Sequence, residues 1–291
     1  MSIFAYDFMQ RALLGALITG LCAPALGIYL VQRRMALIGD GIGHVALTGV
    51  GLGLLTSRSP VLAAVVVAAV GSVAVELVRQ RGKASGDIAL ALLFYGGISG
   101  GVFLVALSAG KTSANLIAYL FGSPLTTTVA DLVVMAVLGA FVLAITLLLR
   151  PWLFAICQDE EYARVAGLPV RALNLLIAVT TAVTVTVAMR AVGLLLVSAM
   201  MVVPVAAAQL ITRGFRATMH LAMALGVLAA GVGIWFAGIY DTAPGATIVL
   251  VAISAFVAIT IGATAWRAWR RRAGPSAGTG ESEPPDVVLQ P

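Results

Sequence analysis

Charge is scarce in this chain of 291 residues. Only 10% of the residues are charged, whereas 61% are hydrophobic and the mean hydropathy is +1.06. A soluble domain carries about 25% charged residues, so soluble enzymes and nucleic-acid-binding modules are poor interpretations. The two cysteines, Cys22 and Cys157, form no CxxC pair and predict no disulfide framework. No GxxxxGK[ST] phosphate loop and no arginine-rich span occurs, so the chain shows no energy source of its own.

Long apolar runs dominate the sequence instead. Because a helix needs roughly 20 mostly apolar residues to cross a membrane, we expect an all-α membrane protein, a polytopic bundle of about nine transmembrane helices. Eight is the alternative if one of the first two runs is re-entrant. The expected spans are Phe8–Val31, Ala36–Leu55, Val61–Val78, Asp87–Ser108, Val129–Leu149, Ala172–Met189, Val192–Thr212, Ala217–Ile239 and Gly245–Ala265.

The basic residues divide unequally between the two sides of these spans. One set of connections holds 14 of the 18 Lys and Arg residues, and the other holds only Arg11, Arg58, Lys111 and Arg190. The positive-inside rule places the larger set in the cytoplasm, with the N-terminus outside and the C-terminus inside. The net charge of +6 therefore indicates topology beside anionic lipid headgroups, not a nucleic-acid partner.

Two segments are not expected to span. Thr112–Ser123 is short and amphipathic, which predicts an interfacial helix on the outer face. Residues 273–291 are rich in Gly, Pro, Ser and acidic residues, which predicts a disordered cytoplasmic tail. Residues 1–272 then form a single transmembrane domain.

Asp40 and His44 stand out as an ionisable pair inside a predicted span. A spacing of four puts both side chains on one helical face, and carboxylate oxygen with imidazole nitrogen suits Zn(II), Mn(II) or Fe(II). Two such helices facing each other across a twofold axis would supply four ligands, and the surrounding glycines would permit close approach. The alternative is that Asp40 caps the helix and His44 makes an interhelical hydrogen bond. The charge rule places the pair in the cytoplasmic half of the membrane unless the glycine-rich helix is kinked.

Other polar residues in or near the spans favour structural interpretations. Glu76, Asp87 and Asp131 lie within about a turn of span ends, where snorkelling or helix capping is expected. His220 is expected to be an interfacial histidine. The methionine pair at 200–201, just before a proline, is expected to be packing rather than a soft metal ligand.

A polar cytoplasmic stretch between the fifth and sixth spans predicts a short capped helix. Acidic residues open it, Arg164 follows them, and Gly167 and a proline close it. Because so short a helix is marginal in water, it is expected to dock into a partner. A plain interfacial helix is the alternative.

Several of these segments together resemble one known family. They are Leu37 to His44, Tyr119 to Ser123, Glu160 to Ala163 followed by Gly167, Met200 to Pro204, and Pro244 to Val249. The chain, up to about Ala265, resembles the permease subunits of ATP-binding-cassette importers for zinc, manganese and iron. It departs from the family in having Gly43 and Val45 beside the histidine, where small residues such as serine and alanine are common.

The resemblance implies a multi-pass protein of the bacterial cytoplasmic membrane, active as a homodimer with cytoplasmic ATP-binding subunits and an external metal-binding protein. It implies no catalytic residue in this chain and no permanently bound cofactor, because ATP is hydrolysed by a separate subunit. Asp40 and His44 would act on the transported metal, zinc or manganese first and iron as a further candidate. The coupling helix would comprise Glu160, Glu161, Tyr162, Ala163, Arg164 and Gly167.

Two other classes of protein remain open. An ion-coupled secondary transporter for a small cation would need no ATPase, and it should show paired, interrupted segments in two halves, which the sequence lacks. A membrane scaffold or enzyme would need a nucleophile with a base, or a dense ligand set, inside the membrane. Co-purification with an ATPase separates the importer from both.

Overall fold

The structure, a computed structural model, describes residues 7–56, 59–80, 86–108, 122 and 127–273. Within these ranges the regular secondary structure is helical throughout, which satisfies the backbone polar groups of apolar segments internally. The helices are α1 (Asp7–Gln32), α2 (Ile38–Leu55), α3 (Pro60–Gln80), α4 (Gly86–Leu107), α6 (Val129–Leu148), α7 (Arg150–Gln158), α8 (Glu160–Val165), α9 (Val170–Val192), α10 (Leu194–Gln209), α11 (Phe215–Tyr240) and α12 (Pro244–Ala273).

Each of the nine expected spans corresponds to a helix, but the helices differ in length. Eight helices among the described residues are long and apolar enough to cross a membrane. The exception is α10, which has 16 residues, or about 24 Å at 1.5 Å per residue. The all-α polytopic fold is confirmed. The expected outer helix at Thr112–Ser123 and the expected tail lie almost wholly outside the described residues.

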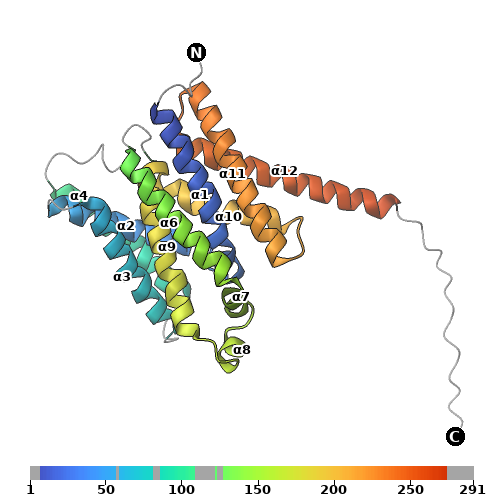
Figure 1. The fold of residues 1–291 in the computed structure, drawn as a ribbon, viewed down its shortest axis with the longest axis horizontal. Coiled ribbons are helices and arrows are strands. Elements are labelled where there is room, and N and C mark those ends of the chain that lie inside the picture. Colours follow the sequence, from blue (N-terminus) through green and yellow to red (C-terminus); the bar gives the residue numbers. More distant parts are fainter. Residues whose placement is uncertain (1–6, 57–58, 81–85, 109–121, 123–126, 274–291) are drawn as a thin grey trace, which may run out of the picture.

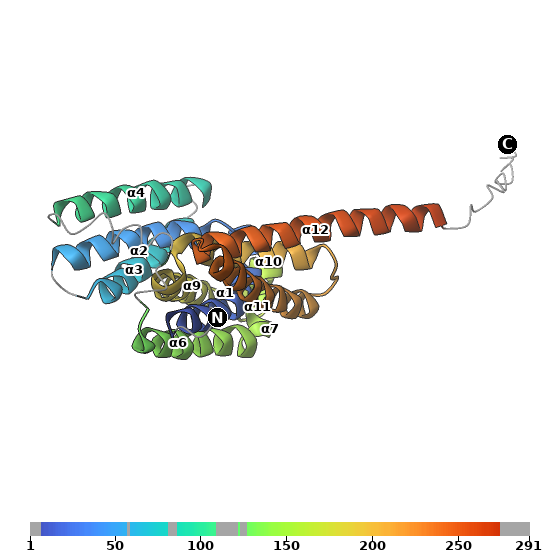
Figure 2. The ribbon, with the colours of Figure 1, turned by 90° about the horizontal axis from the view of Figure 1, so that it is seen from above.

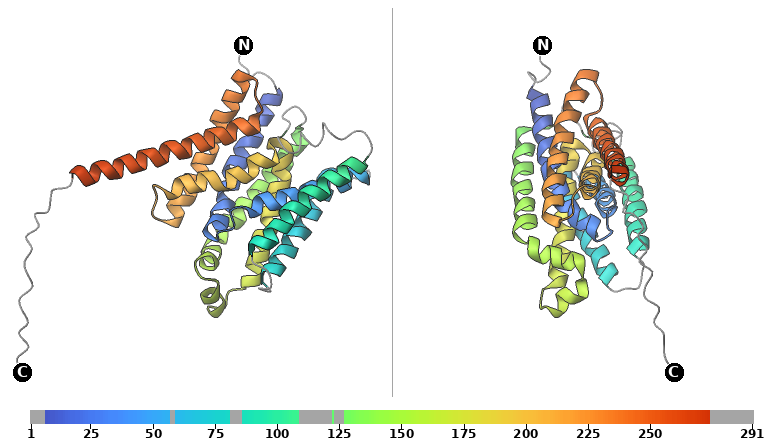
Figure 3. Two further views of the ribbon diagram at one scale, coloured as in Figure 1. Left: turned by 180° about the vertical axis from the view of Figure 1, so that it is seen from behind. Right: turned by 90° about the vertical axis from the view of Figure 1, so that its right-hand side faces the viewer.

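The helices form a buried centre and an exposed periphery. In α1 and α9 72% of the most apolar stretch is buried, against 22% in α3, α4 and α6 and 11% in α12. Figure 2 shows α4 along one edge and α6 along the opposite edge, with α1, α2 and α9 between them. One end of α12 projects away from the bundle (Figures 1 and 3). The centre therefore holds α2, which carries Asp40 and His44.

Small residues bring α2 into close contact with its neighbours. A Cβ atom on Gly49 would lie 2.5 Å from the backbone of α3, and one on Gly97 of α4 would lie 2.6 Å from the carbonyl carbon of His44. A Cβ atom on Gly43 would collide with Leu194 of α10. The predicted close approach is thus realised within one chain, because these glycines pack against α3, α4 and α10.

Polar contacts between distant segments agree with the predicted division of the basic residues between the two ends of the spans. The Arg33 side chain after α1 and the Arg79 side chain of α3 both reach Glu160 of α8, so three members of one predicted side lie together. On the other side, Arg11 donates to the carbonyl of Thr127 over 3.3 Å. Figure 1 shows α7 and α8 at the end of the bundle opposite the N-terminus.

Candidate metal centre and docking helix

Asp40 and His44 lie in the first two turns of α2. The helix begins after Leu37, which makes no side-chain capping bond, and Asp40 lies in the first turn, where the helix dipole favours a negative charge. The carboxylate is 25% exposed and the imidazole 8% exposed. Asp40 is therefore not the N-cap of α2, which removes one half of the structural alternative.

A backbone hydrogen bond defines the tautomer of His44. Its Nδ1 lies 2.8 Å from the carbonyl oxygen of Asp40. A carbonyl oxygen only accepts, so Nδ1 must carry the proton, and Nε2 of the neutral ring keeps its lone pair. The Asp40 carboxylate oxygen Oδ1 is 4.0 Å from Nδ1, too far for a hydrogen bond. The expected interhelical bond of His44 is thus replaced by one within α2, and Nε2 is the nitrogen able to bind a metal.

Two other helices complete the surroundings of the pair. Ser198 of α10 donates to Asp40 Oδ1 over 3.3 Å and shares that proton with the carbonyl of Leu194. The Phe94 ring of α4 packs on the imidazole with 4.2 Å between centroids. Sequence reasoning missed both residues, because nothing local in the sequence links them to α2. In this conformation α4 covers His44.

The pair lies well away from the ends of the bundle. Gly43 packs against Val185 of α9. Val185 follows Val170, the first residue of α9, by about 22 Å at 1.5 Å per residue. Because α9 begins beside α8, Asp40 and His44 lie level with a point beyond the middle of α9, counted from the α8 end. The pair is therefore farther from the α8 end than the cytoplasmic half of the membrane, where the charge rule placed it.

The described part of the chain offers too few donors for a closed metal site. Among the described residues no group of three or more His, Cys, Asp and Glu side chains is close enough to hold an ion. Met200 and Met201 are buried, and the Met201 sulfur lies 3.1 Å from where a Cβ atom of Gly39 would be, which is consistent with packing. Asp40 and His44 alone would leave a four-coordinate ion half-ligated.

The predicted short helix is present as α8. Asp159 caps it by accepting from the backbone N–H groups of Glu161 and Tyr162, both over 2.9 Å. At the other end Gly167 has φ +82°, and the Leu168 N–H bonds to the Ala163 carbonyl over 3.0 Å. This is a Schellman motif, which only a residue tolerant of positive φ closes without strain.

The two faces of α8 differ. Ala163 is fully buried, whereas Tyr162 is 70% and Val165 87% exposed. Glu161, Arg164 and Gly167 are also exposed. An exposed valine and tyrosine on so short a helix form an apolar surface that no described residue covers.

Glu160 is the member of α8 that points into the bundle. Its carboxylate is 31% exposed and pairs with Arg33 at 3.2 Å, Arg79 at 3.7 Å and Arg164 at 3.7 Å. Glu76 is 2% exposed and holds Arg79 through two hydrogen bonds of 2.9 and 2.8 Å. The expectation that Glu76 snorkels or caps a helix is therefore wrong, because its carboxylate is neutralised inside the bundle.

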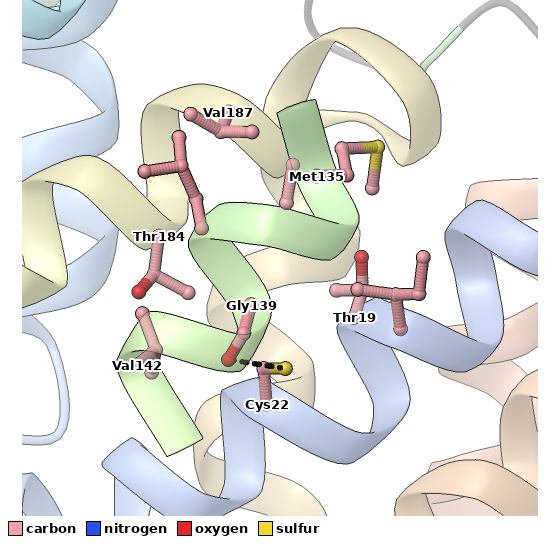
Figure 4. Close-up of a pocket in the computed structure, with 10 residues that line it drawn as sticks. Thr19, Cys22, Met135, Gly139, Val142, Thr184 and Val187 are labelled. Carbon is pink, nitrogen blue, oxygen red and sulfur yellow. Dashed lines mark hydrogen bonds between the residues drawn. The ribbon is translucent and has the colours of Figure 1, made fainter. Parts of the chain in front are cut away.

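The remaining candidate residues have structural roles or none. Asp131 forms a capping box with Thr128 at the start of α6, as expected. His220 is exposed on α11, and the side chain of Asp87 lies outside the described atoms. A small pocket between α1, α6 and α9 is lined by apolar and threonine side chains (Figure 4), and the Cys22 thiol beside it donates to the Gly139 carbonyl. It holds no ligand set for a metal ion.

Comparison with known proteins identifies the family. Residues 5–263 match the model of the ABC 3 transport family. The chain is 34% identical over 254 residues to the manganese transport system membrane protein MntC of Halalkalibacterium halodurans, covering 87% of each protein. It is 27% identical to the high-affinity zinc uptake system membrane protein ZnuB of Haemophilus influenzae, covering 87% of this chain and 96% of that protein.

A solved structure agrees with this match. The structure titled PsaBC from Streptococcus pneumoniae in complex with Fab contains a chain with a TM-score of 0.79 and 27% identity, covering 88% of this chain and 92% of that one. The chain therefore belongs to the ABC 3 transport family.

Proposed function

From membership of the ABC 3 transport family, we propose that this chain is the permease subunit of an ATP-driven importer for a divalent transition metal. The cargo is zinc or manganese first and iron as a further candidate, since the donor set suits all three. Relatives named for manganese and zinc transport support this range. ATP is hydrolysed by a separate subunit in the cytoplasm, an external binding protein delivers the metal, and the N-terminus lies outside.

The observation that carries the proposal is the half-complete donor set on α2. Asp40 offers a partly exposed carboxylate, and His44 offers Nε2 because its Nδ1 proton is bonded to the backbone. A second copy of the chain across a twofold axis brings the total to four donors. Such a site holds the ion without enclosing it in one subunit, and transport requires that the ion can leave.

The cover over His44 fits an alternating-access cycle. Phe94 packs on the imidazole, and α4 is an exposed helix at the edge of the bundle. The Phe94 ring covers the imidazole in the described conformation, so this half-site is closed, and separation of α4 from α2 would open it. ATP binding in the partner subunit supplies the free energy for that separation, transmitted through α8.

Uptake by variants of the pair tests the metal role. Asp40→Ala and His44→Ala should abolish ATP-dependent accumulation of Mn(II) and Zn(II) in vesicles that hold the complete complex. His220→Gln and Asp241→Asn are the matched controls, because both residues are exposed and far from the pair in sequence. If the first two variants, normally folded, transport like the parent, the proposed role of the pair is wrong.

A second experiment tests the docking surface of α8. Val165→Asp places a charge on the most exposed apolar residue of the helix and should release the ATPase subunit during affinity purification, whereas Arg171→Gln on the adjacent start of α9 should not. Retention of the ATPase by Val165→Asp would contradict docking through α8. Metal uptake by the permease without any ATPase would instead favour an ion-coupled secondary transporter.

A further inference from the structure

Glu160 joins four separate segments of the chain at the α8 end of the bundle. Besides Arg33 and Arg79, its carboxylate accepts a hydrogen bond of 3.2 Å from the Asn174 amide of α9. These partners belong to the turn after α1, to α3 and to α9. Among the described residues, every ion pair that joins two different helices or turns includes the Glu160 carboxylate.

The buried charges of this cluster balance only with the Glu160 carboxylate present, and Arg164, 65% exposed, adds a further pair to Glu160 at 3.7 Å on the surface side. Arg33 and Arg79 carry two positive charges, and Glu76 and Glu160 carry two negative ones. The Arg33 side chain is 5% exposed, and burial first, then the Arg79 guanidinium, lower the pKa of Arg33 below its usual value. Glu76 also attracts Arg33, but the Glu160 carboxylate is its hydrogen-bonded partner at 3.2 Å, so loss of Glu160 removes the direct contact that holds the turn after α1 against α8.

The same helix therefore carries two opposite surfaces. Tyr162 and Val165 face away from the bundle, while Glu160 and the fully buried Ala163 face into it. Ala163 supplies only nonpolar contact, which allows sliding, whereas a carboxylate shared by two guanidinium groups resists displacement in every direction. Besides the backbone connections of α8 to α7 and α9, the Glu160 carboxylate is the charged contact through which a force on the outer surface of α8 would reach the turn after α1 and α3.

The helices that Glu160 holds are also those that pack around the metal pair. A Cβ atom on Gly27 of α1 would collide with the backbone of Met201, and Met201 in turn packs beside Gly39, next to Asp40. The helix α3 packs against α2 at Gly49, and α9 reaches Gly43 through Val185. Each of the three held helices thus contacts α2 directly or through one residue.

We propose that Glu160 is the mechanical link of this permease, the residue that makes α1, α3 and α9 move together when α8 is displaced. The proposal rests on the proposed function, because it needs a partner that displaces α8. It assigns to Glu160 a positioning role distinct from docking. Arg33 and Arg79 are its two anchors.

The ratio of metal imported to ATP hydrolysed measures this link. Glu160→Gln and Arg33→Gln are compared with Arg171→Gln, an exposed arginine in the first turn of α9 with no ion pair among the described residues. The complete complex is placed in vesicles with Mn(II) or Zn(II) supplied by the binding protein. We expect the metal imported per ATP hydrolysed by the bound ATPase to fall about tenfold in both test variants. The double variant should be no worse than Glu160→Gln alone, because the Arg33 contact is among those that Glu160→Gln already weakens.

Each outcome decides the proposal. A parent complex that imports no metal would overturn the proposed function itself. If the parent imports metal normally and Glu160→Gln has the same ratio of metal imported to ATP hydrolysed, only the mechanical link is overturned, even if import and hydrolysis both slow down. The link is also overturned if Glu160→Gln releases part of the ATPase but the ratio for the ATPase that stays bound is unchanged. If Glu160→Gln does not assemble, Asn174→Leu removes one neutral hydrogen bond to Glu160, and the ratio should still fall about twofold to threefold. An unchanged ratio in Asn174→Leu overturns the link.

Discussion

Two groups of polar residues in this protein differ in how completely they are satisfied. At the α8 end of the bundle, Glu76, Arg79, Glu160 and Arg33 form a neutral set in which each charged group has an opposite charge within 3.7 Å. On α2, Asp40 and His44 are 4.0 Å apart. Among the described residues Nε2 of His44 has no hydrogen-bond partner, and the Asp40 carboxylate accepts one hydroxyl proton that Ser198 shares with the Leu194 carbonyl. The first group is complete within the chain, whereas the second is not.

The difference separates a structural role from a ligand-binding role. Buried charges are costly unless they are paired, and a complete set has no coordination left for an ion. An incomplete set next to glycine-rich packing keeps its donors available, which is what a transient metal site requires. The sequence places Asp40 and His44 inside a span and Glu76 near a span end, but it does not show that Glu76, Arg79, Glu160 and Arg33 form one group.

The largest expected effect is on stability and comes from the complete group. Glu76→Leu removes the carboxylate that holds Arg79 by two hydrogen bonds, and breaking such a buried pair should cost about 3 kcal/mol of unfolding free energy. Unfolding of the purified protein by SDS titration measures this. Glu161→Gln, on an exposed neighbour of Glu160, should change the value by about 0.5 kcal/mol or less. Equal stability of the two variants would show that the Glu76 pair is not a structural element.

The incomplete group should show the reverse pattern. Asp40→Asn keeps the size of the side chain but removes the anionic ligand, so metal uptake should fall by about 100-fold or more. Its free energy of unfolding should change by only about 0.5 kcal/mol, because Ser198 can still donate to the amide oxygen. Uptake assays and the same SDS titration test both parts. A large loss of stability would place Asp40 with the structural residues.

The sequence predicted the helices well because the interactions that form each helix lie within its own segment. An apolar run in a membrane must satisfy its backbone within the helix, so hydropathy alone located all nine segments. The cap and Schellman residues of α8 are also local signals. Asp40 and His44 were found because intramembrane charges are few. In each case the decisive residues belong to one continuous segment of the chain.

The rest depended on contacts between distant segments. Glu76 near a span end has the same local pattern whether it snorkels or pairs, and only the fold brings Arg33 and Glu160 near Arg79. The glycines of α2 predicted close packing, but their partners α3, α4 and α10 could not be read from the sequence. Phe94 and Ser198 are 50 and 158 positions away from His44 and Asp40 respectively, so no local pattern identifies them.

Ser198 offers a smaller perturbation of the incomplete group. Ser198→Ala removes the hydroxyl that donates to Asp40 Oδ1, so the carboxylate is oriented less firmly. We expect metal affinity to fall about 10-fold, the low end for a residue that orients a ligand, and Ser198→Thr should restore most of it. Metal titration of the purified complex provides the measurement. If Ser198→Ala and the parent bind metal equally, Asp40 is positioned by α2 alone.

The smallest expected effect comes from the cover over the pair. Phe94→Ala removes the ring that packs 4.2 Å from the His44 imidazole without touching any donor atom. His44 should become several-fold more reactive toward diethyl pyrocarbonate, measured by mass spectrometry of the peptide that contains it, while the exposed His220 in the same molecule serves as an internal control. Phe103→Ala is the matched variant, because Phe103 lies on the same helix but is 64% exposed. If Phe94→Ala leaves the reactivity of His44 unchanged, access to the pair is controlled by the glycine packing between α2 and α4, where Gly97 and Gly101 hold the two backbones together. The difference between the complete and the incomplete group would still hold, but access to Asp40 and His44 would then be controlled by the whole of α4 rather than by the Phe94 ring.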